Sequence, residues 1–176
     1  YYRHPDKVVV TGTPVRGDFF RMSKSQAKKS LGLDDGRKLL VSFWGSLGAS
    51  VMNGYMQEFF CLEAKDRSFH HIHAAGRSGY AAMKQAVEKS GVDLSSYREL
   101  DLREYIYDMP AVMRAADLVI CRAGASTISE LTALGVPAVI VPSPYVTNNH
   151  QEKNAGILAD AGAAVMLREQ ECSGEI

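Results

Sequence analysis

Short apolar runs recur along the chain, and each is followed by a turn and then by a segment with the spacing of an amphipathic helix. Short runs rich in β-branched side chains, bounded by glycine or polar residues, are typical of buried strands. The predicted strands cover 7–10, 38–43, 69–74, 97–102, the run that opens the stretch 116–130, 136–141 and 163–167.

Between these runs the apolar positions change to helical spacing. Asp108 followed by Pro110 is typical of a helix start, and Gly162 of a helix end. Continuous apolar strands that alternate with helices indicate a parallel sheet covered on both faces. We therefore predict an α/β fold, a Rossmann-like doubly wound parallel sheet, which binds ligands beyond the carboxyl ends of its strands. The predicted helices cover 49–60, a segment ending near Gly91, 110–115, the second half of 116–130, and 149–161.

The stretch 116–130 combines a strand, a turn of small residues and a helix start. Backbone N–H groups in this turn, around Gly124 and Ala125, could approach a phosphate closely, and the positive end of the helix dipole would favour it. Glu130 would follow about one turn later, within reach of a sugar diol. The same residues fit a capping box, because Thr127 and Glu130 have the required spacing and would then bind only the helix's own N–H groups. The stretch alone leaves both interpretations open.

Three further segments at this edge of the predicted sheet carry candidate contacts. In the turn 45–49, Ser46 and the nearby amides would touch a phosphate, although this GxxG pattern also suits a tight turn against a helix. Arg16 would pair with a diphosphate or remain a solvated cation. In 105–109, a planar base would lie with its polar edge on the backbone of Ile106, unless these residues belong only to the core.

A long polar turn at 142–154 leads into the last predicted helix. Carboxamides both donate and accept hydrogen bonds, which suits sugar hydroxyls. His150, Gln151 and Asn154 would converge on the crevice that also holds Gly124. The alternative is that the asparagines before His150 serve only the turn and the helix cap, and that His150 is simply exposed. A turn suited to phosphate beside a turn suited to hydroxyls favours a nucleotide-sugar as the ligand.

Composition narrows the class of protein. The 176 residues suit one domain with a full core, and 20 Lys and Arg balance 20 Asp and Glu, so no polybasic surface predicts a nucleic acid partner. We find no signal peptide and no bilayer-spanning run, and three widely spaced cysteines fit a reducing compartment. We expect a cytoplasmic globular domain. Because the chain starts without Met and stops where another helix could start, we also expect a piece of a longer protein.

Motifs for hydrolytic or metal chemistry are missing from the sequence. It contains no Ser nucleophile elbow, HExxH or CxxC pattern. His70, His71 and His73 alternate in and beside a strand and do not form a predicted ligand cluster, while His4 and His150 stand alone. The sequence therefore predicts no metal site.

Five motifs in one order closely resemble the C-terminal, donor-binding half of the MurG glycosyltransferases, over nearly the whole chain. In that family UDP-N-acetylglucosamine (UDP-GlcNAc) donates GlcNAc to the lipid-linked muramyl-pentapeptide of peptidoglycan synthesis. The resemblance implies the C-terminal half of a GT-B glycosyltransferase, with residues 1–176 as one UDP-sugar-binding domain. The motifs are Thr13-Pro14-Val15-Arg16, Gly45-Ser46-x-Gly48-Ala49, Tyr105-Ile106-x-Asp108-Met109, Cys121-Arg122-x-Gly124-Ala125-x-Thr127-x-Ser129-Glu130 and His150-Gln151-x-x-Asn154-Ala155.

The resemblance implies contacts for each part of the donor. The Ile106 backbone would read the uracil, and Glu130 would hold the ribose. Ser46 and the amides of 125–127 would hold the diphosphate, and Arg16 would lie on the donor. The full implied set, which includes the sugar contacts, is Arg16, Ser46, Ile106, Gly124, Ala125, Ser126, Thr127, Ile128, Ser129, Glu130, His150, Gln151 and Asn154.

Gln151, with His150 and Asn154, would contact the GlcNAc hydroxyls. Three departures from the family bear on these contacts. The commonest family form has Gly-Gly-Ser-Gln-Gly where residues 44–48 here are Trp-Gly-Ser-Leu-Gly, a Ser often stands in place of Ala123, and the usual Gln-Gln pair is His-Gln. The uridine pocket therefore matches the family pattern more fully than the diphosphate and sugar contacts do.

Family members are two-domain, metal-independent, inverting enzymes whose amino-terminal domain holds the acceptor, the membrane-facing patch and the general base. The resemblance thus implies no catalytic residue, cofactor or metal in this chain, and no activity of the chain alone. It implies an intact enzyme on the cytoplasmic face of the bacterial membrane that converts undecaprenyl-linked lipid I to lipid II. The alternatives are a GT-B glycolipid transferase using UDP-glucose or UDP-galactose, a donor-binding subunit recruited by a membrane partner, and a nucleotide-binding module without transfer.

Overall fold

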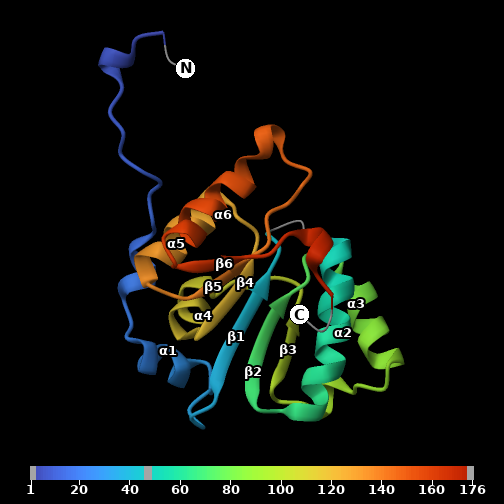
Figure 1. Cartoon of the computed structure of the whole chain (residues 1–176). Helices are drawn as coiled ribbons and strands as arrows, with labels where there is room; N and C mark the ends of the chain where they lie inside the picture. Colours follow the sequence, from blue (N-terminus) through green and yellow to red (C-terminus); the bar gives the residue numbers. More distant parts are fainter. Residues whose placement is uncertain (1–2, 46–48, 174–176) are drawn as a thin grey trace.

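A single parallel sheet forms the centre of the molecule (Figure 1). The computed structural model describes residues 3–45 and 49–173. The strand order is β3-β2-β1-β4-β5-β6, and every neighbouring pair is parallel. This order confirms the predicted doubly wound sheet. The strands are β1 (Lys38–Phe43), β2 (Phe69–Ala74), β3 (Leu100–Arg103), β4 (Leu118–Cys121), β5 (Ala138–Ile140) and β6 (Ala164–Met166).

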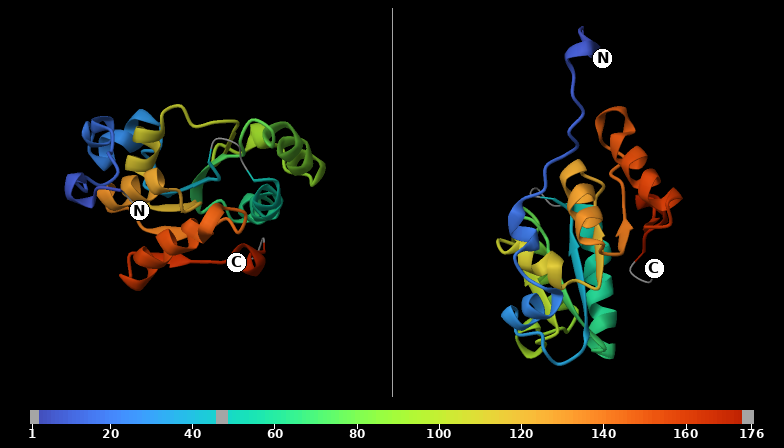
Figure 2. Two further views of the ribbon diagram at one scale, coloured as in Figure 1. Left: turned by 90° about the horizontal axis from the view of Figure 1, so that it is seen from above. Right: turned by 90° about the vertical axis from the view of Figure 1, so that its left-hand side faces the viewer.

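Helices cover both faces of this sheet (Figure 2). Helices α2 and α3 pack together on one face beside β1 to β3, whereas α1, α4, α5 and α6 follow one another on the opposite side. The helices are α1 (Lys24–Ser30), α2 (Ser50–Asp66), α3 (Tyr80–Lys89), α4 (Met109–Ala115), α5 (Ala125–Leu134) and α6 (His150–Asp160). Short 3-10 turns lie at Pro5–Lys7, Gly17–Phe20, Leu94–Ser96, Thr147–Asn149 and Glu169–Glu171.

Both faces of strand β1 are buried, so its side chains contribute to the core on each side of the sheet. Leu39, Val41 and Phe43 pack in the cluster that includes α4 and α5, where Val112 and Leu131 are buried. The opposite cluster joins α2 and α3 and contains Met52, Met56, Phe60, Met83 and Val87. Burial on both faces explains why these strands are continuous apolar runs in the sequence.

The prediction of a strand at 7–10 is wrong. Pro5–Lys7 is a 3-10 turn, and Val9 and Val10 follow as extended chain, 81% and 92% exposed, with no strand assigned there. The segment projects away from the domain (Figure 1). A β-branched run favours extended backbone, but it forms a strand only where a neighbour offers hydrogen bonds.

The bounds of other elements differ modestly from the prediction. Helix α2 continues to Asp66, and β3 begins at Leu100 after a 3-10 turn. Helix α1 was not predicted. It is short and polar, and its start is fixed by a capping box in which the Ser23 hydroxyl accepts from the Gln26 N–H while the Gln26 side chain accepts from Ser23 N–H.

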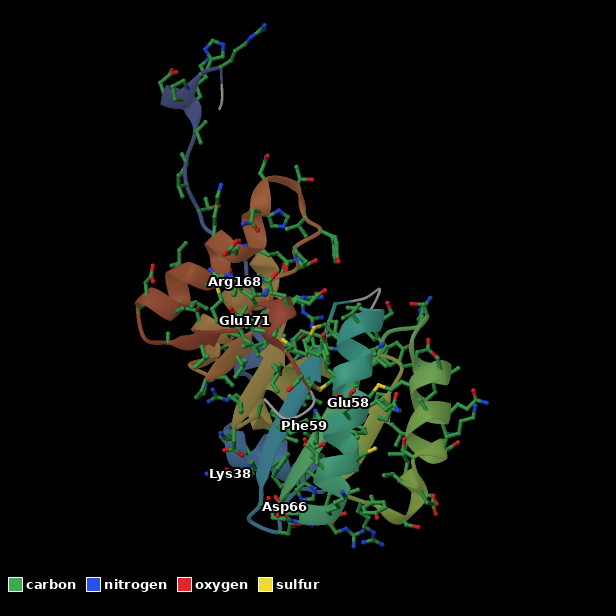
Figure 3. The ribbon with its side chains drawn as sticks, turned by 45° about the vertical axis from the view of Figure 1, so that its right-hand side comes forward. Lys38, Glu58, Phe59, Asp66, Arg168 and Glu171 are labelled. Atoms are coloured by element: carbon green, nitrogen blue, oxygen red, sulfur yellow. The ribbon has the colours of Figure 1, made fainter. Side chains whose placement is uncertain are left out.

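An apolar groove of about 770 Å³ runs between α2 and the sheet, along β1 and strands β4 to β6. Phe59, Tyr55 and Met52 line it from α2, and Val139 and Val165 line it from the sheet. Figure 3 shows Phe59 on the side of α2 turned toward the strands, with Lys38 and Asp66 at the amino end of the sheet. No helix in the described part of the chain is long and apolar enough to cross a bilayer.

Candidate functional site

A cavity of about 770 Å³ lies at the carboxyl ends of the strands. It sits where β1 adjoins β4, with β2 and β3 to one side and β5 and β6 to the other. Such a topological switch point is where doubly wound sheets bind ligands. The lining residues are Phe43, Trp44, Gly45, Ala49, Ser50, Val51, Asn53, Ser78, Gly79, Arg122, Gly124, Thr127, Ser143, Tyr145, Gln151 and Glu169.

The start of α5 faces this cavity with open hydrogen-bond donors. Gly124 is the N-cap residue, no side chain caps the helix, and the first helical bond is from Ile128 N–H to Gly124 C=O at 3.0 Å. In the described part of the chain, no hydrogen bond uses the N–H groups of Ala125, Ser126 or Thr127. The capping-box interpretation is therefore wrong, because Thr127 is the third helical residue and not the cap.

Gly124 is not required by the protein's own packing. Its φ of −66° suits any residue, and a Cβ built on it would meet only Thr127 Oγ1, at 3.8 Å. Both residues line the cavity. The missing side chain thus leaves open space beside the free N–H groups.

Glu130 lies one turn further along α5 and is half-buried. No hydrogen bond or ion pair joins its carboxylate to another described residue. Burial raises the pKa of Glu130, and the positive charge of Arg16 opposes that shift. Arg16 itself is exposed and lies over the Phe19 ring, 5.5 Å from its centroid. The two predicted residues are thus close enough to interact, although neither lines the cavity.

Ile106 lies in the loop between β3 and α4, away from the lining of the cavity. Its side chain is buried in the main core. Its neighbours Tyr105 and Tyr107 are exposed, with ring centroids 5.0 Å apart. No hydrogen bond among described residues uses the Ile106 backbone groups, although the residue as a whole is buried.

The turn before α6 carries the predicted sugar contacts. Gln151 lines the cavity, and its Oε1 accepts a hydrogen bond from the Ser143 N–H at 2.9 Å. Asn154 lies outside the lining and donates from Nδ2 to the Ala123 carbonyl at 3.0 Å, which ties α6 to the turn before α5. His150 is exposed, lies outside the lining, and places its Nδ1 2.9 Å from the carbonyl of Thr147.

Sequence reasoning missed Arg122 as a site residue, although it lies in one of the five motifs. Its guanidinium donates to the carbonyls of Val141 and Pro142 at 3.1 and 3.2 Å and pairs with Glu169. It also lies 5.9 Å from the centroid of the Trp44 ring. Arg122 therefore joins the ends of β1, β4, β5 and β6 around the cavity.

The structure gathers only part of the predicted set. Gly124, Thr127 and Gln151 line one cavity, and Ser46 lies outside the described residues. Beyond the cavity lining, Ala125 and Ser126 are exposed in the first turn of α5, Ile128 packs on the main core, and Ser129 is half-buried.

Comparison with known proteins decides the family. The model for the glycosyltransferase family 28 C-terminal domain matches residues 39–176. This chain belongs to that family. Curated enzymes named as UDP-N-acetylglucosamine--N-acetylmuramyl-(pentapeptide) pyrophosphoryl-undecaprenol N-acetylglucosamine transferases, from Acetivibrio thermocellus and Caldanaerobacter subterraneus, are each 42% identical to this chain, over 100% and 97% of it. The chain spans 46% of the length of each.

Solved structures agree with this assignment. MurG of Acinetobacter baumannii matches this chain with a TM-score of 0.69 and 26% identity, over 97% of this chain and 47% of that one. The sequence resemblance to the MurG family is thereby confirmed. ALG13 matches at a TM-score of 0.55 and 16% identity, over 77% of this chain and 81% of that one, which shows a shared fold.

Proposed function

We propose that this chain is the donor-binding half of a MurG-type GlcNAc transferase and binds UDP-GlcNAc at the carboxyl edge of its sheet. The observation that carries the proposal is the start of α5, where three N–H groups without a described partner border open space at the switch point. Helix starts of this kind bind phosphate groups. The family relationship is consistent with this use.

The donor diphosphate would lie against the start of α5. Ala49 and Ser50, at the start of α2, line the same cavity, so two helix dipoles point at one place. Charge that grows on the diphosphate as UDP leaves would be stabilised by these fixed amides, without a metal or other cofactor. Ser46, from the turn between β1 and α2, would add a contact.

The uridine would lie toward Glu130 and Ile106. The Glu130 carboxylate has no described hydrogen-bond partner, so it could accept hydrogen bonds from the two hydroxyls of a ribose. Arg16, near Glu130, would neutralise part of the donor's charge. The backbone groups of Ile106, which have no described hydrogen-bond partner, would pair with the edge of the uracil.

The GlcNAc would lie toward α6. Because Gln151 Oε1 is held by the Ser143 N–H, the Gln151 amide presents its Nε2 donors to the ligand. Asn154 would act mainly by fixing the turn that contains Ala123, and its Oδ1 stays available as an acceptor. His150 would complete the sugar end of the site.

In the intact enzyme, the acceptor hydroxyl of the lipid-linked muramyl-pentapeptide would attack the anomeric carbon and release UDP, converting lipid I to lipid II. The general base, acceptor site and membrane contact would come from the other half, on the cytoplasmic face of the membrane. Holding the donor rigidly lowers the entropic part of the barrier. Alone, this chain should bind the donor weakly and transfer nothing.

Titration calorimetry with UDP, UDP-GlcNAc, UDP-glucose and UDP-galactose tests the proposal. Glu130→Gln should weaken UDP binding about tenfold by removing a charge-assisted hydrogen bond, with an unchanged melting temperature. Glu88→Gln on the exposed face of α3 is the matched control. Turnover of a lipid acceptor by this chain alone, or no UDP binding at millimolar concentrations, would reject the proposal. Tighter binding of UDP-glucose or UDP-galactose would favour a glycolipid transferase instead.

A further inference from the structure

Five polar side chains from β1, β2 and α2 form a buried chain of contacts that ends at the cavity. Glu63 Oε2 lies 2.8 Å from His71 Nδ1. Ser42 Oγ lies 2.6 Å from both His71 Nε2 and His73 Nδ1, and His73 Nε2 lies 3.3 Å from Asn53 Oδ1. All five residues are buried, so water does not satisfy these groups.

Asn53, the last residue in this series of polar contacts, lies in the wall of the cavity. Asn53 Nδ2 donates to the Ala75 carbonyl at 2.9 Å, at the end of β2. The amide also packs on Gly79, where an added Cβ would lie 2.2 Å from Asn53 Nδ2. Ser78 and Gly79 line the cavity. Asn53 therefore holds the turn between β2 and α3 in place.

The directions of these hydrogen bonds require one extra proton. The Ala75 carbonyl only accepts, so Asn53 turns its Oδ1 toward His73, which must donate from Nε2. The Ser42 hydroxyl has one proton, so it accepts from one imidazole and donates to the other. With an ionised Glu63 and two neutral imidazoles, every bond can be made except the last, where a bare His73 Nε2 would face the Asn53 oxygen.

The extra proton belongs beside Glu63. A buried carboxylate is costly unless it is neutralised, and His71 is the imidazole in contact with it. The rings of Phe59 and Phe60 pack edge-on against His71, which keeps the pair in an apolar setting. His73 is further from the Glu63 carboxylate, because His71 and Ser42 lie between them in this series of contacts. Burial and the neighbouring His71 hold the pKa of His73 well below its usual range, so His73 stays neutral.

We propose that Glu63 and His71 share one proton that sets the direction of the hydrogen bonds out to Asn53, making Asn53 a positioning residue for the donor cavity. In this arrangement His71 donates from Nε2 to Ser42, Ser42 donates to His73 Nδ1, and His73 donates to Asn53. Every polar group along the path from His71 to Asn53 then has a partner, as buried networks require. The effect on the cavity rests on the proposed donor binding.

Nitrogen NMR of the whole chain, with isotope-labelled histidine, tests the proton arrangement without any ligand. At neutral pH, His73 should be the neutral Nε2–H tautomer, and His71 should carry a proton on Nε2. Single His-to-Asn variants assign the signals. A His73 ring protonated on Nδ1 alone would overturn the proposal.

Variants at Glu63 test the proton arrangement. Glu63→Gln can donate its own N–H to His71 Nδ1, so it should preserve the His73 tautomer and the affinity for UDP. Glu63→Met has a similar size but makes no hydrogen bond, so His71 can keep its proton on Nε2 and donate to Ser42, and the His73 tautomer should again be preserved. A His73 ring protonated on Nδ1 alone in Glu63→Gln would overturn the proton arrangement.

A variant at Asn53 tests the link to the cavity. Asn53→Asp keeps the size of the side chain but, when ionised, cannot donate to the Ala75 carbonyl, so UDP binding should fall about fivefold. Unchanged binding in this variant would overturn the positioning role. A wild-type chain that binds no UDP would reject the proposed function, whereas the histidine tautomers would still decide the proton arrangement.

Discussion

Replacing Gly124 with alanine separates ligand binding from folding. The φ of −66° fits alanine, and the new methyl would meet only Thr127 Oγ1, at 3.8 Å. Alanine loses less chain entropy on folding, worth about 0.4–1 kcal/mol, but is a poorer N-cap than glycine by a similar amount, about 0.5–1 kcal/mol. These opposing terms leave the melting temperature nearly unchanged.

The effect on UDP binding should be much larger. A Cβ extends about 1.5 Å into the space beside the free N–H groups of α5 and would push a phosphate oxygen beyond the roughly 2.7–3.2 Å of a hydrogen bond. Losing one charge-assisted bond costs about 1.5–3 kcal/mol, so affinity should fall at least about tenfold.

Calorimetry of UDP binding and thermal unfolding of Gly124→Ala measure the two effects. Gly156→Ala in α6 is the control, because nothing lies within 4 Å of its added Cβ. It should raise stability by about 1 kcal/mol through helix propensity and leave UDP binding unchanged. Wild-type UDP affinity in Gly124→Ala would refute the assignment of the diphosphate to the start of α5.

Three further predictions concern stability, reactivity and sugar binding. Asp117→Asn should lower the free energy of unfolding by about 2 kcal/mol in denaturant titrations, because Asp117 accepts from Lys28 Nζ at 2.6 Å and from the Leu39 N–H at 2.9 Å. Burial raises the Asp117 pKa, but hydrogen bonds to two lysines and this N–H lower it well below its ordinary value. This stabilisation is therefore present at neutral pH and lost as the pH falls below about 4, in the wild type but not in Asp117→Asn. Burial raises the pKa of Cys121 to about 12, so mass spectrometry should find this thiol unalkylated until the chain is denatured. Gln151→Ala should weaken UDP-GlcNAc binding about fivefold but not UDP binding, and an equal loss for both would move Gln151 away from the sugar.

The sequence predicts β1 and β2 at their observed bounds, because each is flanked by turn residues and buried on both sides. The same kind of signal fails at 7–10. A run of β-branched apolar residues indicates a preference for extended backbone, but it does not indicate whether a neighbouring strand is present. A strand inside a sheet and an exposed apolar tail therefore look alike in a single sequence.

Some parts of the candidate site can likewise be predicted from the sequence, and others cannot. The start of α5 is predictable because the strand, the turn at Gly124 and the helix are consecutive. Arg122 and Glu169 are 47 residues apart, and their ion pair depends on β4 and β6 ending at the same edge. The role of Asn53, in α2, depends on His73 in β2 and on Ala75 just after that strand. Contacts of this kind follow from the strand order, which local pattern does not specify.

The strand order also determines how the local stability against opening varies from strand to strand. β1 has a neighbour on each side and helices on both faces, whereas β6 pairs only with β5, and Val165 is largely exposed. Amide exchange should therefore be slowest in β1 and fastest in β6, which can open without unfolding the rest. Because Glu169 lies three residues after the end of β6 and pairs with Arg122, such an opening would release Arg122. The wall of the cavity would then loosen well before the fold is lost.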